Sequence, residues 1–298
     1  MKFQLNGLVA ATHTPFHPDG SLASEVVPVQ AAHLAEQGIR SVFITGSTGE
    51  AHSLTRDERL AMFTAWAKAG PEHDIKVVAH VGSNCIEDAK AFAAAAADLG
   101  LDAISALAPS YYKPASIEDL VECCGAIASA APSLPFYYYD IPVLTGVRFP
   151  MSDFLKSATG QIPNLVGIKF TNDDLDEFQV ARSVGDFDLP WGIDEKLLDA
   201  LQTGATGAVG SSYNFAAPLY RDLIDAYEAG DIDTARKLQQ QAIDLIDTLA
   251  AIGYLGAAKA VMGWQGVPVG PARLPISNPT PAQLDALREK LHPPVLQS

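Results

Sequence analysis

The sequence predicts one α/β domain, a (β/α)8 TIM barrel followed by a C-terminal helical extension. Eight short, strand-like apolar runs recur between residues 7 and 211, and helical patterns separate most of them. Strands that alternate with helices form βαβ units around a parallel sheet. Eight such units fit a closed barrel better than an open, doubly wound sheet. No Ser-, Gly- or Pro-rich linker divides the 298 residues, so we predict one domain, 1–298.

The predicted strands are runs of four to six mostly apolar residues, as expected where both faces of a parallel sheet are covered. They span residues 7–11, 41–45, 76–81, 103–108, 136–141, 166–170, 189–193 and 208–211. The helical patterns between them span residues 26–37, 56–68, 86–99, 117–130, 151–157 and 195–203. The last predicted strand–helix units contain fewer residues than the earlier ones.

Three further helical patterns follow the eighth strand, at 218–229, 231–249 and 281–290. Asp231 and Asp233 come directly after Gly230, and acidic residues after a glycine stop are typical of a helix start. We therefore divide the domain into a barrel at 1–213 and packed C-terminal helices at 214–298. These helices exceed what a barrel needs, and they either cover it or serve an oligomer interface.

Composition narrows the class of partner. The formal net charge of −15 argues against nucleic acid and anionic membranes as partners, because both require clustered Lys and Arg. No apolar run approaches the ~18 residues of a membrane helix. Three cysteines without CxxC spacing indicate a reduced, cytoplasmic protein. Residues 1–6 lack the apolar run and cleavage site of a signal peptide, so we expect none.

Lys169 lies within the apolar run 165–171. An unpaired ammonium in such a strand loses its hydration, and burial favours the neutral amine, which attacks carbonyl groups. The alternative is a strand-end lysine that extends to water. By strand alternation Gly167, Lys169 and Thr171 share one face, and the small residue and the hydroxyl would leave room for a ligand.

Residues that follow strands are the first candidates for a site, because chemistry in barrels gathers at the carboxyl ends of strands. Gly46-Ser47-Thr48-Gly49-Glu50 follows the second strand and combines two turn-forming glycines with two hydroxyls. Backbone N–H groups and hydroxyls form an anion site suited to a carboxylate. An ordinary strand-to-helix turn is the alternative. Glu50 belongs to the turn or to an interior network, and His52 to the surface or to packing.

Tyr137, Tyr138 and Tyr139 occupy the fifth predicted strand, which Pro142 ends. Period-2 alternation places Tyr137 and Tyr139 on one face and Tyr138 on the other. We expect Tyr139 to face Lys169 across the barrel mouth, where its hydroxyl could relay a proton. Aromatic residues are otherwise simply good strand formers.

Asp194 and Glu195 follow the seventh predicted strand, and small residues through Gly210 and Ser211 close the eighth. Carboxylates and small residues at a rim suit sugar hydroxyls, although both acids also suit a helix N-terminus. No histidine stands near the two acids in sequence, and no HxH pair occurs among the seven histidines. We therefore predict no metal.

Three segments together resemble the N-acetylneuraminate lyase and dihydrodipicolinate synthase superfamily. They are 46–50 (GSTGE), 139–142 (YDIP) and 167–169 (GIK). Within this superfamily, the N-acetylneuraminate lyases are the most similar members over four stretches, 136–146, 192–195, 204–214 and 270–275. Asp140 departs from the family pattern, which usually has Asn or His there, and His52 has no standard counterpart.

The resemblance implies a (β/α)8 enzyme of the class I, Schiff-base type that cleaves N-acetylneuraminate reversibly into N-acetylmannosamine and pyruvate. Lys169 would form the imine and Tyr139 would move the proton of the 4-hydroxyl. Ser47 and Thr48 would hold the carboxylate. The residues that would contact the sugar tail are Thr171, Gly192, Asp194, Glu195, Gly210 and Ser211. Tyr111 would enter a neighbouring subunit's site, which implies a homotetramer. No cofactor is implied.

Rival functions remain open at this stage. An aldolase or dehydratase of the same fold that acts on a 2-keto-3-deoxy sugar acid would share Lys169 and Tyr139. Dihydrodipicolinate synthase activity is disfavoured, because Val143 and Leu144 stand where such synthases usually carry an arginine. A non-catalytic sensor and a metal-dependent aldolase are the candidates from other classes.

Overall fold

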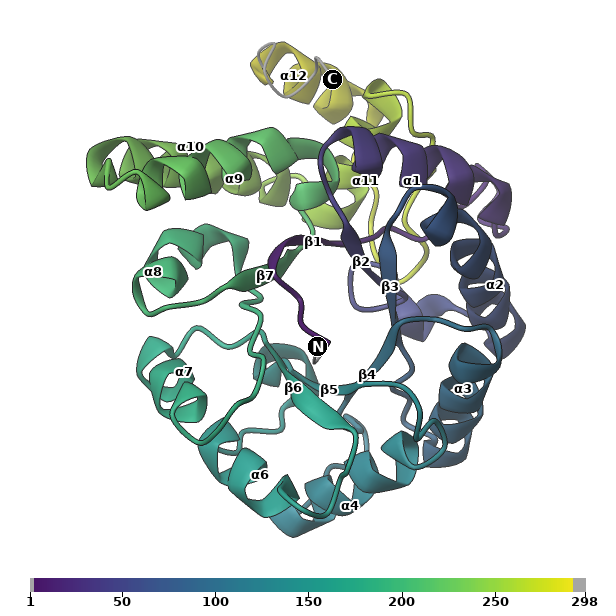
Figure 1. Ribbon diagram of the computed structural model, residues 1–298. Coiled ribbons are helices and arrows are strands. Elements are labelled where there is room, and N and C mark those ends of the chain that lie inside the picture. Colours follow the sequence, from purple (N-terminus) through teal and green to yellow (C-terminus); the bar gives the residue numbers. More distant parts are fainter. Residues whose placement is uncertain (1–2, 292–298) are drawn as a thin grey trace. The chain divides into compact units, whose positions relative to one another are not determined.

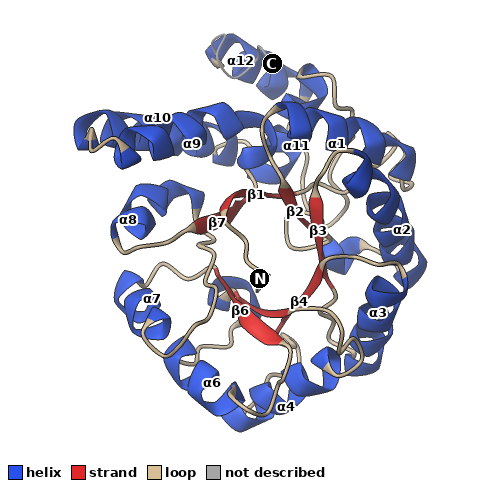
Figure 2. Ribbon diagram, in the orientation of Figure 1, coloured by secondary structure: helices blue, strands red, loops and turns tan. Residues whose placement is uncertain are grey.

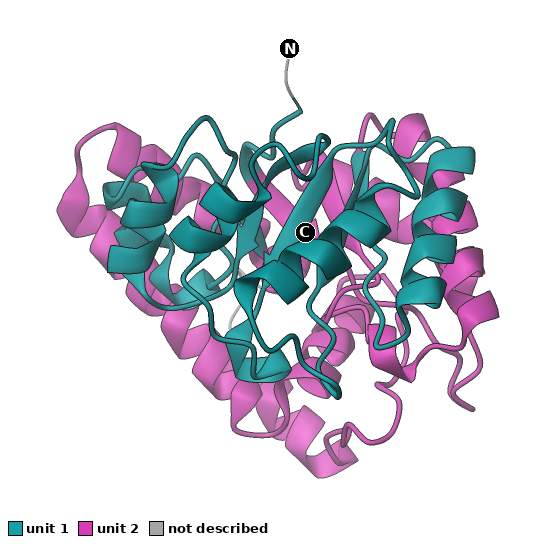
Figure 3. Ribbon diagram, turned by 90° about the horizontal axis from the view of Figure 1, so that it is seen from below, with its two compact units in different colours: residues 1–7, 76–209 teal, residues 8–75, 210–298 magenta. Residues whose placement is uncertain are grey.

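The protein is described by a computed structural model, which covers residues 3–291. Met1, Lys2 and His292, which enter the sequence arguments, lie outside this range. The chain forms two compact units, one of residues 1–7 and 76–209 and one of residues 8–75 and 210–298 (Figure 3). The two-part boundary at residue 213 stays a prediction.

The first unit is built on parallel strands. Its strands are β3 (Lys76–His80), β4 (Ala103–Leu107), β5 (Phe136–Asp140), β6 (Leu165–Phe170) and all but the last residue of β7 (Gly207–Gly210). The pairs β3–β4, β4–β5 and β5–β6 are all parallel. Figure 2 distinguishes the strands (red) from the helices (blue). Helices between and after them are α3 (Ile86–Asp98), α4 (Ile117–Ala128), α5 (Pro142–Thr145), α6 (Met151–Ala158), α7 (Leu175–Arg182) and α8 (Leu197–Gln202). The predicted βαβ units are confirmed.

The predicted strand at 189–193 is wrong as a continuous strand. This segment makes only isolated parallel bridges, from Asp188 to Gly167 and from Trp191 to Phe170 and Ala208. Pro190 lies between them and has no N–H to donate, so it interrupts the ladder. The segment still runs beside β6, because the N–H of Phe170 donates to the carbonyl of Pro190 at 2.9 Å.

The second unit combines two parallel strands with long helices. It contains β1 (Gly7–Ala11) from Leu8 onward, and β2 (Ser41–Ile44), which pairs with it. Its helices are α1 (Val27–Glu36), α2 (Arg56–Glu72), α9 (Tyr213–Glu228), α10 (Ile232–Ala250), α11 (Tyr254–Trp264) and α12 (Pro281–Lys290). Helices α9 and α10 lie side by side (Figure 1). The predicted C-terminal helices are confirmed.

Capping residues explain where these helices begin. The Asp231 side chain accepts a hydrogen bond from the N–H of Thr234 at 3.1 Å, so Asp231 is the N-cap of α10, as expected. Thr55 and Glu58 form a capping box at the start of α2. The sequence patterns missed α11, because its residues YLGAAKAVMGW are apolar or small on nearly all sides and give no 3.6-residue period.

Within residues 3–291 no single helix is long and apolar enough to span a membrane, although α10 and α11 together, bent by 108°, pass a test of length and composition. The apolar side chains of both helices enter the core of the unit. The buried ones include Leu245, Leu249, Val261 and Met262. Burial of this kind is typical of the core helices of a globular protein.

An aromatic cluster fixes β6 and the segment after it. Phe170 stacks on Trp191 with ring centroids 5.9 Å apart, and both rings contact Phe178 of α7 at 5.2 Å. Phe170 and Trp191 are both fully buried, and aromatic pairs of this kind stabilise beyond the area they bury. The cluster holds the end of β6, where Lys169 and Thr171 lie on either side of Phe170.

Candidate active site

Lys169 is buried beside Tyr139. The two residues are register partners on neighbouring strands, and the Lys169 Nζ lies 3.8 Å from the centroid of the Tyr139 ring. Lys169 is 4% exposed, so the alternative in which its amine extends to water is wrong. The expectation that Tyr139 faces it from across the barrel mouth is also wrong, because β5 and β6 are adjacent and bring the side chains into direct contact.

His80, at the end of β3, extends this pair. Its ring meets the Tyr139 ring edge to face, with centroids 5.8 Å apart and an interplanar angle of 86°. The N–H of Leu107 donates to its Nε2 at 3.4 Å, and His80 is fully buried. On sequence grounds, His80 is considered only as a possible metal ligand. The overlooked signal is position, since His80 ends a strand.

Alternation along β5 is confirmed. The Tyr137 hydroxyl donates to Asp188 Oδ2 at 2.6 Å, while Tyr138 packs on Phe154 of α6 with centroids 4.8 Å apart. Asp188 Oδ2 also accepts from the N–H of Leu5 at 2.7 Å. Burial, and then the charge of Asp188, raises the pKa of Tyr137, so this hydroxyl remains a donor. Tyr137 therefore has a structural role through its hydrogen bond to Asp188, whereas Tyr139 contacts Lys169.

Thr171 and Gly192 lie against each other. A Cβ on Gly192 would fall 2.0 Å from Thr171 Oγ1, which no real side chain tolerates, so this position requires glycine. Thr171 Oγ1 is buried, and no described residue forms a hydrogen bond with it. Position 167 requires glycine for a reason other than the predicted space for a ligand. A Cβ there would lie 1.7 Å from the carbonyl oxygen of Asp188, so close backbone packing excludes any side chain.

A pocket of about 440 Å³ opens beside these residues. Thr171 and Glu195 line it, together with Pro142, Val143, Arg148, Asn172, Asp173, Ile193 and Lys196. Asp194 and Glu195 form the first turn of a 3-10 helix, Asp194–Lys196, and Asp194 is 6% exposed. Both acids thus start a short helix, as one alternative expected, and Glu195 also faces the pocket.

The segment 46–50 in the second unit is a tight turn, as predicted. Thr45 and Glu50 have positive φ angles of 50° and 54°, and the N–H of Ala51 donates to the carbonyl of Gly46 at 3.1 Å. A Cβ on Gly49 would lie 2.8 Å from the backbone of Thr45. Ser47 and Thr48 are half-buried within this turn.

Glu50 belongs to an interior ion pair. Lys259 of α11 donates to its Oε1 at 2.8 Å, and the N–H of Arg273 donates to Oε2 at 2.8 Å. Lys259 also donates to the carbonyls of Thr14 and Pro271, and both charged side chains are 0% exposed. Burial lowers the pKa of Lys259, whereas Glu50 opposes that shift. The fixed position of Glu50 anchors one end of the 46–50 turn.

Gly210 is the last residue of β7 and Ser211 follows it, and both belong to the second unit. Gly210 is buried, and the Ser211 hydroxyl is 2.8 Å from the hydroxyl of Tyr254 on α11. The next hydroxyl, that of Ser212, donates to Tyr220 at 2.7 Å and is fully buried. The two serines therefore differ: Ser212 is part of the core, and Ser211 is half-buried at the end of the strand.

Among residues 3–291, no group of three or more His, Cys, Asp or Glu side chains could hold a metal ion. His13 and His17 do have HxxxH spacing, but their surroundings differ. His13 is fully buried and its pKa is lowered to about 3, first by burial and then by Lys259. His17 is exposed and lies 3.2 Å from Glu25. The metal-free mechanism stays a prediction.

Comparison with known proteins identifies the family. The Dihydrodipicolinate synthetase family matches residues 4–293. The chain belongs to this family. The N-acetylneuraminate lyase of Xenopus tropicalis is 39% identical over 97% of this chain and 96% of its own length. The native N-acetylneuraminate lyase structure from Aliivibrio salmonicida has a TM-score of 0.93 at 38% identity, covering 97% and 96% of the two chains. The lyase of Proteus mirabilis has a TM-score of 0.93 at 36% identity, with 97% and 98% covered.

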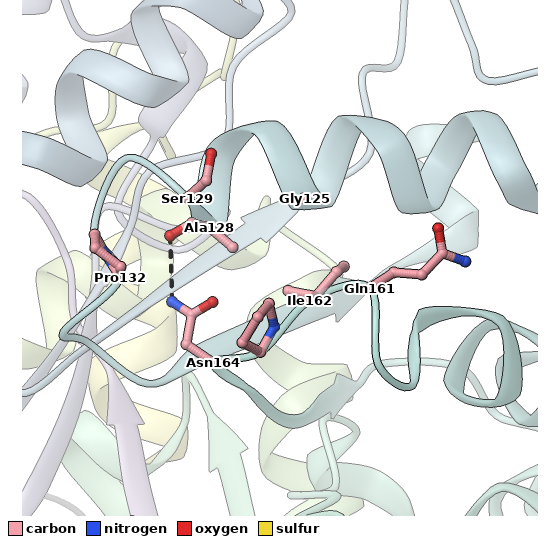
Figure 4. A pocket seen from close by; sticks show the side chains of 8 residues that line it. Gly125, Ala128, Ser129, Pro132, Gln161, Ile162 and Asn164 are labelled. Carbon is pink, nitrogen blue, oxygen red and sulfur yellow. Dashed lines mark hydrogen bonds between the residues drawn. The ribbon is translucent and has the colours of Figure 1, made fainter.

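These matches confirm the predicted fold class, because the α/β, TIM-barrel-like fold of the dihydrodipicolinate synthetase family extends over nearly the whole chain. In such folds the amino ends of strands serve stability. A pocket of about 240 Å³ near the start of β6 fits that rule (Figure 4). Of its two amides, Asn164 donates to the carbonyls of Ala128, Ala131 and Leu134, and Gln161 donates to the carbonyl of Ser157. No titratable side chain of the described residues lines it. We assign it no chemistry.

Tyr111, the predicted intersubunit residue of this family member, is 77% exposed, and its neighbour Tyr112 is 86% exposed. The two rings meet edge to face with centroids 5.0 Å apart. The N–H of Tyr111 donates to Asn84 Oδ1 at 3.0 Å, which fixes the backbone while both side chains project. Two large exposed aromatic side chains on one loop are typical of a contact surface.

Proposed function

We propose that this chain is an N-acetylneuraminate lyase, a carbon–carbon lyase that cleaves N-acetylneuraminate reversibly into N-acetylmannosamine and pyruvate. The relatives reported above carry this name and extend over nearly the full chain. The single observation that carries the proposal is the buried amine of Lys169 over the ring of Tyr139. A buried amine beside a phenol is suited to imine chemistry.

The reaction begins at Lys169. Its amine adds to the C2 carbonyl of the open-chain sugar acid, the Tyr139 hydroxyl gives a proton, and water leaves, which gives a protonated imine and a Tyr139 phenolate. Tyr139 accepts the proton of the 4-hydroxyl, the C3–C4 bond breaks, and C4 becomes the aldehyde of N-acetylmannosamine. The electron pair of that bond moves into the iminium and forms an enamine. Protonation at C3 and hydrolysis then release pyruvate and restore Lys169.

Substrate binding is assigned residue by residue on the family resemblance. Ser47 and Thr48 hold the carboxylate, which suits a tight turn with hydroxyls and backbone N–H groups. The residues assigned to the hydroxylated tail are Thr171, Gly192, Asp194, Glu195, Gly210 and Ser211. The contact of Thr171 with Gly192, and the place of Thr171 and Glu195 in one pocket, support this assignment.

A lyase for a 2-keto-3-deoxy sugar acid is the second candidate, since it would use the same lysine and tyrosine. Dihydrodipicolinate synthase activity is less well supported, because Val143 and Leu144 are exposed apolar residues where an arginine would be expected. We propose no metal and no cofactor, so activity should survive EDTA.

We also propose a homotetramer in the cytoplasm. The exposed Tyr111 and Tyr112 support a subunit contact, with Tyr111 completing a neighbour's site. The free state of Cys85, Cys123 and Cys124 supports a reducing compartment. Sedimentation of the purified chain tests the tetramer, and a monomer with full activity would contradict it.

Borohydride trapping tests the proposed chemistry. Incubation with pyruvate and borohydride should add one reduced pyruvate to Lys169, as read by peptide mass spectrometry. Lys169→Ala should give no adduct, whereas Lys196→Ala, which removes a half-exposed lysine, should leave the adduct intact. A panel of 2-oxo sugar acids should show the fastest pyruvate release from N-acetylneuraminate. No adduct, or equal or faster release from 2-keto-3-deoxygluconate, would overturn the proposal.

A further inference from the structure

Asp140 ends β5 directly after Tyr139 and is only 2% exposed. Its carbonyl oxygen accepts a hydrogen bond from the N–H of Thr171 at 2.8 Å. Its side-chain Oδ2 is buried and has no hydrogen-bond partner among residues 3–291. A buried carboxyl group with an unsatisfied oxygen is costly, so its presence calls for a reason other than stability.

The side chain of Asn172 lies beside this carboxyl group, because both residues line one cavity and Asn172 lowers the pKa of Asp140. Asn172 Oδ1 accepts from the N–H of Asp174 at 3.3 Å, and the NH2 group of the same side chain is a donor. Asp174 in turn caps α7 by accepting from the N–H of Glu177 at 2.9 Å. Asp140 thus meets the 171–172 segment at two places, by a main-chain hydrogen bond at Thr171 and by its carboxyl group beside Asn172.

The carboxyl group faces a cavity of about 200 Å³. Charged groups approach it from each neighbouring segment: Arg148 after α5, Asp174 at the start of α7, and Glu177 on α7. Tyr138 lies beside it on its own strand. Burial raises the pKa of Asp140 to about 7, the Asn172 hydrogen bond opposes this, Glu177 adds to it, and Arg148 opposes it. Asp140 therefore changes charge near neutral pH.

We propose that Asp140 is a positioning residue that fixes the 171–172 segment, and through it Thr171, for recognition of the sugar part of the substrate. This inference rests on the proposed lyase function. Ionised Asp140 accepts from Asn172 in a charge-assisted hydrogen bond, which is stronger than the bond that the neutral acid accepts. The segment is therefore held more tightly above neutral pH than below it.

The imine chemistry at Lys169 does not require this bond, because pyruvate alone lacks the sugar tail. A general structural defect would change substrate binding and pyruvate trapping together, whereas loss of this bond should change only binding. The KM for N-acetylneuraminate should depend on Asp140, and the rate of pyruvate trapping on Lys169 should not.

The test compares wild type, Asp140→Asn, Asp140→Ala and Asn172→Ala from pH 6 to pH 8. In wild type the KM for N-acetylneuraminate should fall as pH rises through about 7, by roughly threefold or more. Asp140→Asn keeps the shape of the side chain and an uncharged oxygen that can accept from Asn172. Its KM should therefore lie between those of wild type and Asp140→Ala at pH 8, and should not change with pH. Asp140→Ala and Asn172→Ala should raise KM at pH 8 by about tenfold. Trapping rates should match wild type in all three.

Asp153→Asn is the matched control, because Asp153 is a half-exposed residue of α6 paired with Lys156 and should keep the wild-type profile. A wild-type pH profile in Asp140→Asn, or an unchanged KM in Asn172→Ala, would overturn the assignment even if Asp140→Ala failed to fold. Wild-type protein that neither traps pyruvate nor cleaves N-acetylneuraminate would overturn the lyase function, and this inference with it. If wild-type protein traps pyruvate and cleaves N-acetylneuraminate but its KM does not change with pH, only the role of Asp140 would be overturned.

Discussion

Lys169 Nζ lies 3.8 Å from the centre of the Tyr139 ring, and the two residues occupy directly opposed positions on β5 and β6. Their exposed fractions are 4% and 2%. The ring face therefore contacts the amine, while the phenol hydroxyl is a separate group that can exchange a proton. This division allows the ring and the hydroxyl to be tested separately.

Tyr139→Phe should leave the ring in place and remove only the proton carrier. We expect kcat for N-acetylneuraminate cleavage to fall by about 10²- to 10⁴-fold, the usual contribution of a positioned acid–base group. Lys169 should still form a trapped adduct with pyruvate, because the amine and its aromatic contact remain. Steady-state kinetics and mass spectrometry measure the two effects.

Tyr138→Phe is the control for this substitution. Tyr138 is the next residue, its hydroxyl is buried without a partner, and its ring packs on Phe154 on the other face of β5. Its loss of a hydroxyl should leave kcat within about twofold, since surface or packing changes away from the chemistry have small effects. Equal losses in both variants would contradict the role of Tyr139.

Local patterns predicted most strands because their runs are short, apolar and bounded by turn residues. Ranges 76–81 and 136–141 each ended within one residue of β3 and β5. The pattern failed at 189–193, where apolar residues suggest a strand but Pro190 breaks the ladder. It also failed at α11, where small residues on all sides hide the helical period.

The candidate site was predictable where a residue's own surroundings in sequence are unusual, as for Lys169 in an apolar run. Contacts between distant segments were not predictable. The partner of Glu50 is Lys259, 209 residues away, and nothing near either residue indicates the pair. Asp140 is visible in the sequence only as a departure from a family pattern, because its cavity and its place beside Asn172 exist only in the fold.

Gly192→Ala should damage sugar recognition and spare the imine. The new Cβ would lie 2.0 Å from Thr171 Oγ1 and 2.9 Å from the carbonyl oxygen of Phe170, so the 171 segment must move. We expect kcat/KM for N-acetylneuraminate to fall by about tenfold or more, since overpacking of this kind costs about 1–3 kcal/mol. Pyruvate trapping on Lys169 should continue at the wild-type rate.

Gly185→Ala supplies the comparison, because its Cβ would meet Phe187 at 3.4 Å, an ordinary contact, on an exposed loop. That variant should keep wild-type kinetics. A Gly192→Ala enzyme with unchanged kcat/KM would show that Thr171 and Gly192 lie outside the sugar site.

Lys259→Met should destabilise the second unit strongly. The substitution leaves the Glu50 carboxylate buried with only the N–H of Arg273 as a donor, and loss of one partner of a buried ion pair costs about 3–5 kcal/mol. Glu50→Gln/Lys259→Met should cost less than the sum of the single changes, because the unpaired charge is absent. Urea denaturation gives both values.

Lys90→Met calibrates that comparison, since Lys90 forms an exposed ion pair with Glu87 on α3. Its loss should cost less than about 1 kcal/mol. If Lys259→Met proved as mild, the ion pair would have no part in fixing the 46–50 turn.

Asp140→Asn should stabilise the protein at alkaline pH. The folded-state pKa of Asp140, about 7, lies above its ordinary value of 3.8, so the folded state binds more protons than the unfolded state between these values. The free energy of unfolding therefore falls as pH rises from about 4 to 7, by about 1.4 kcal/mol for each unit of pKa difference. The amide of the variant has no charge to bury, so the variant's advantage over wild type should grow across this window and stay constant above pH 8.

Urea denaturation from pH 4 to pH 9 measures this advantage, with Asp153→Asn as the exposed counterpart. An advantage that did not change with pH would mean that Asp140 is already ionised at low pH in the folded protein, and a positioning role that depends on its charge would then require a different titrating group.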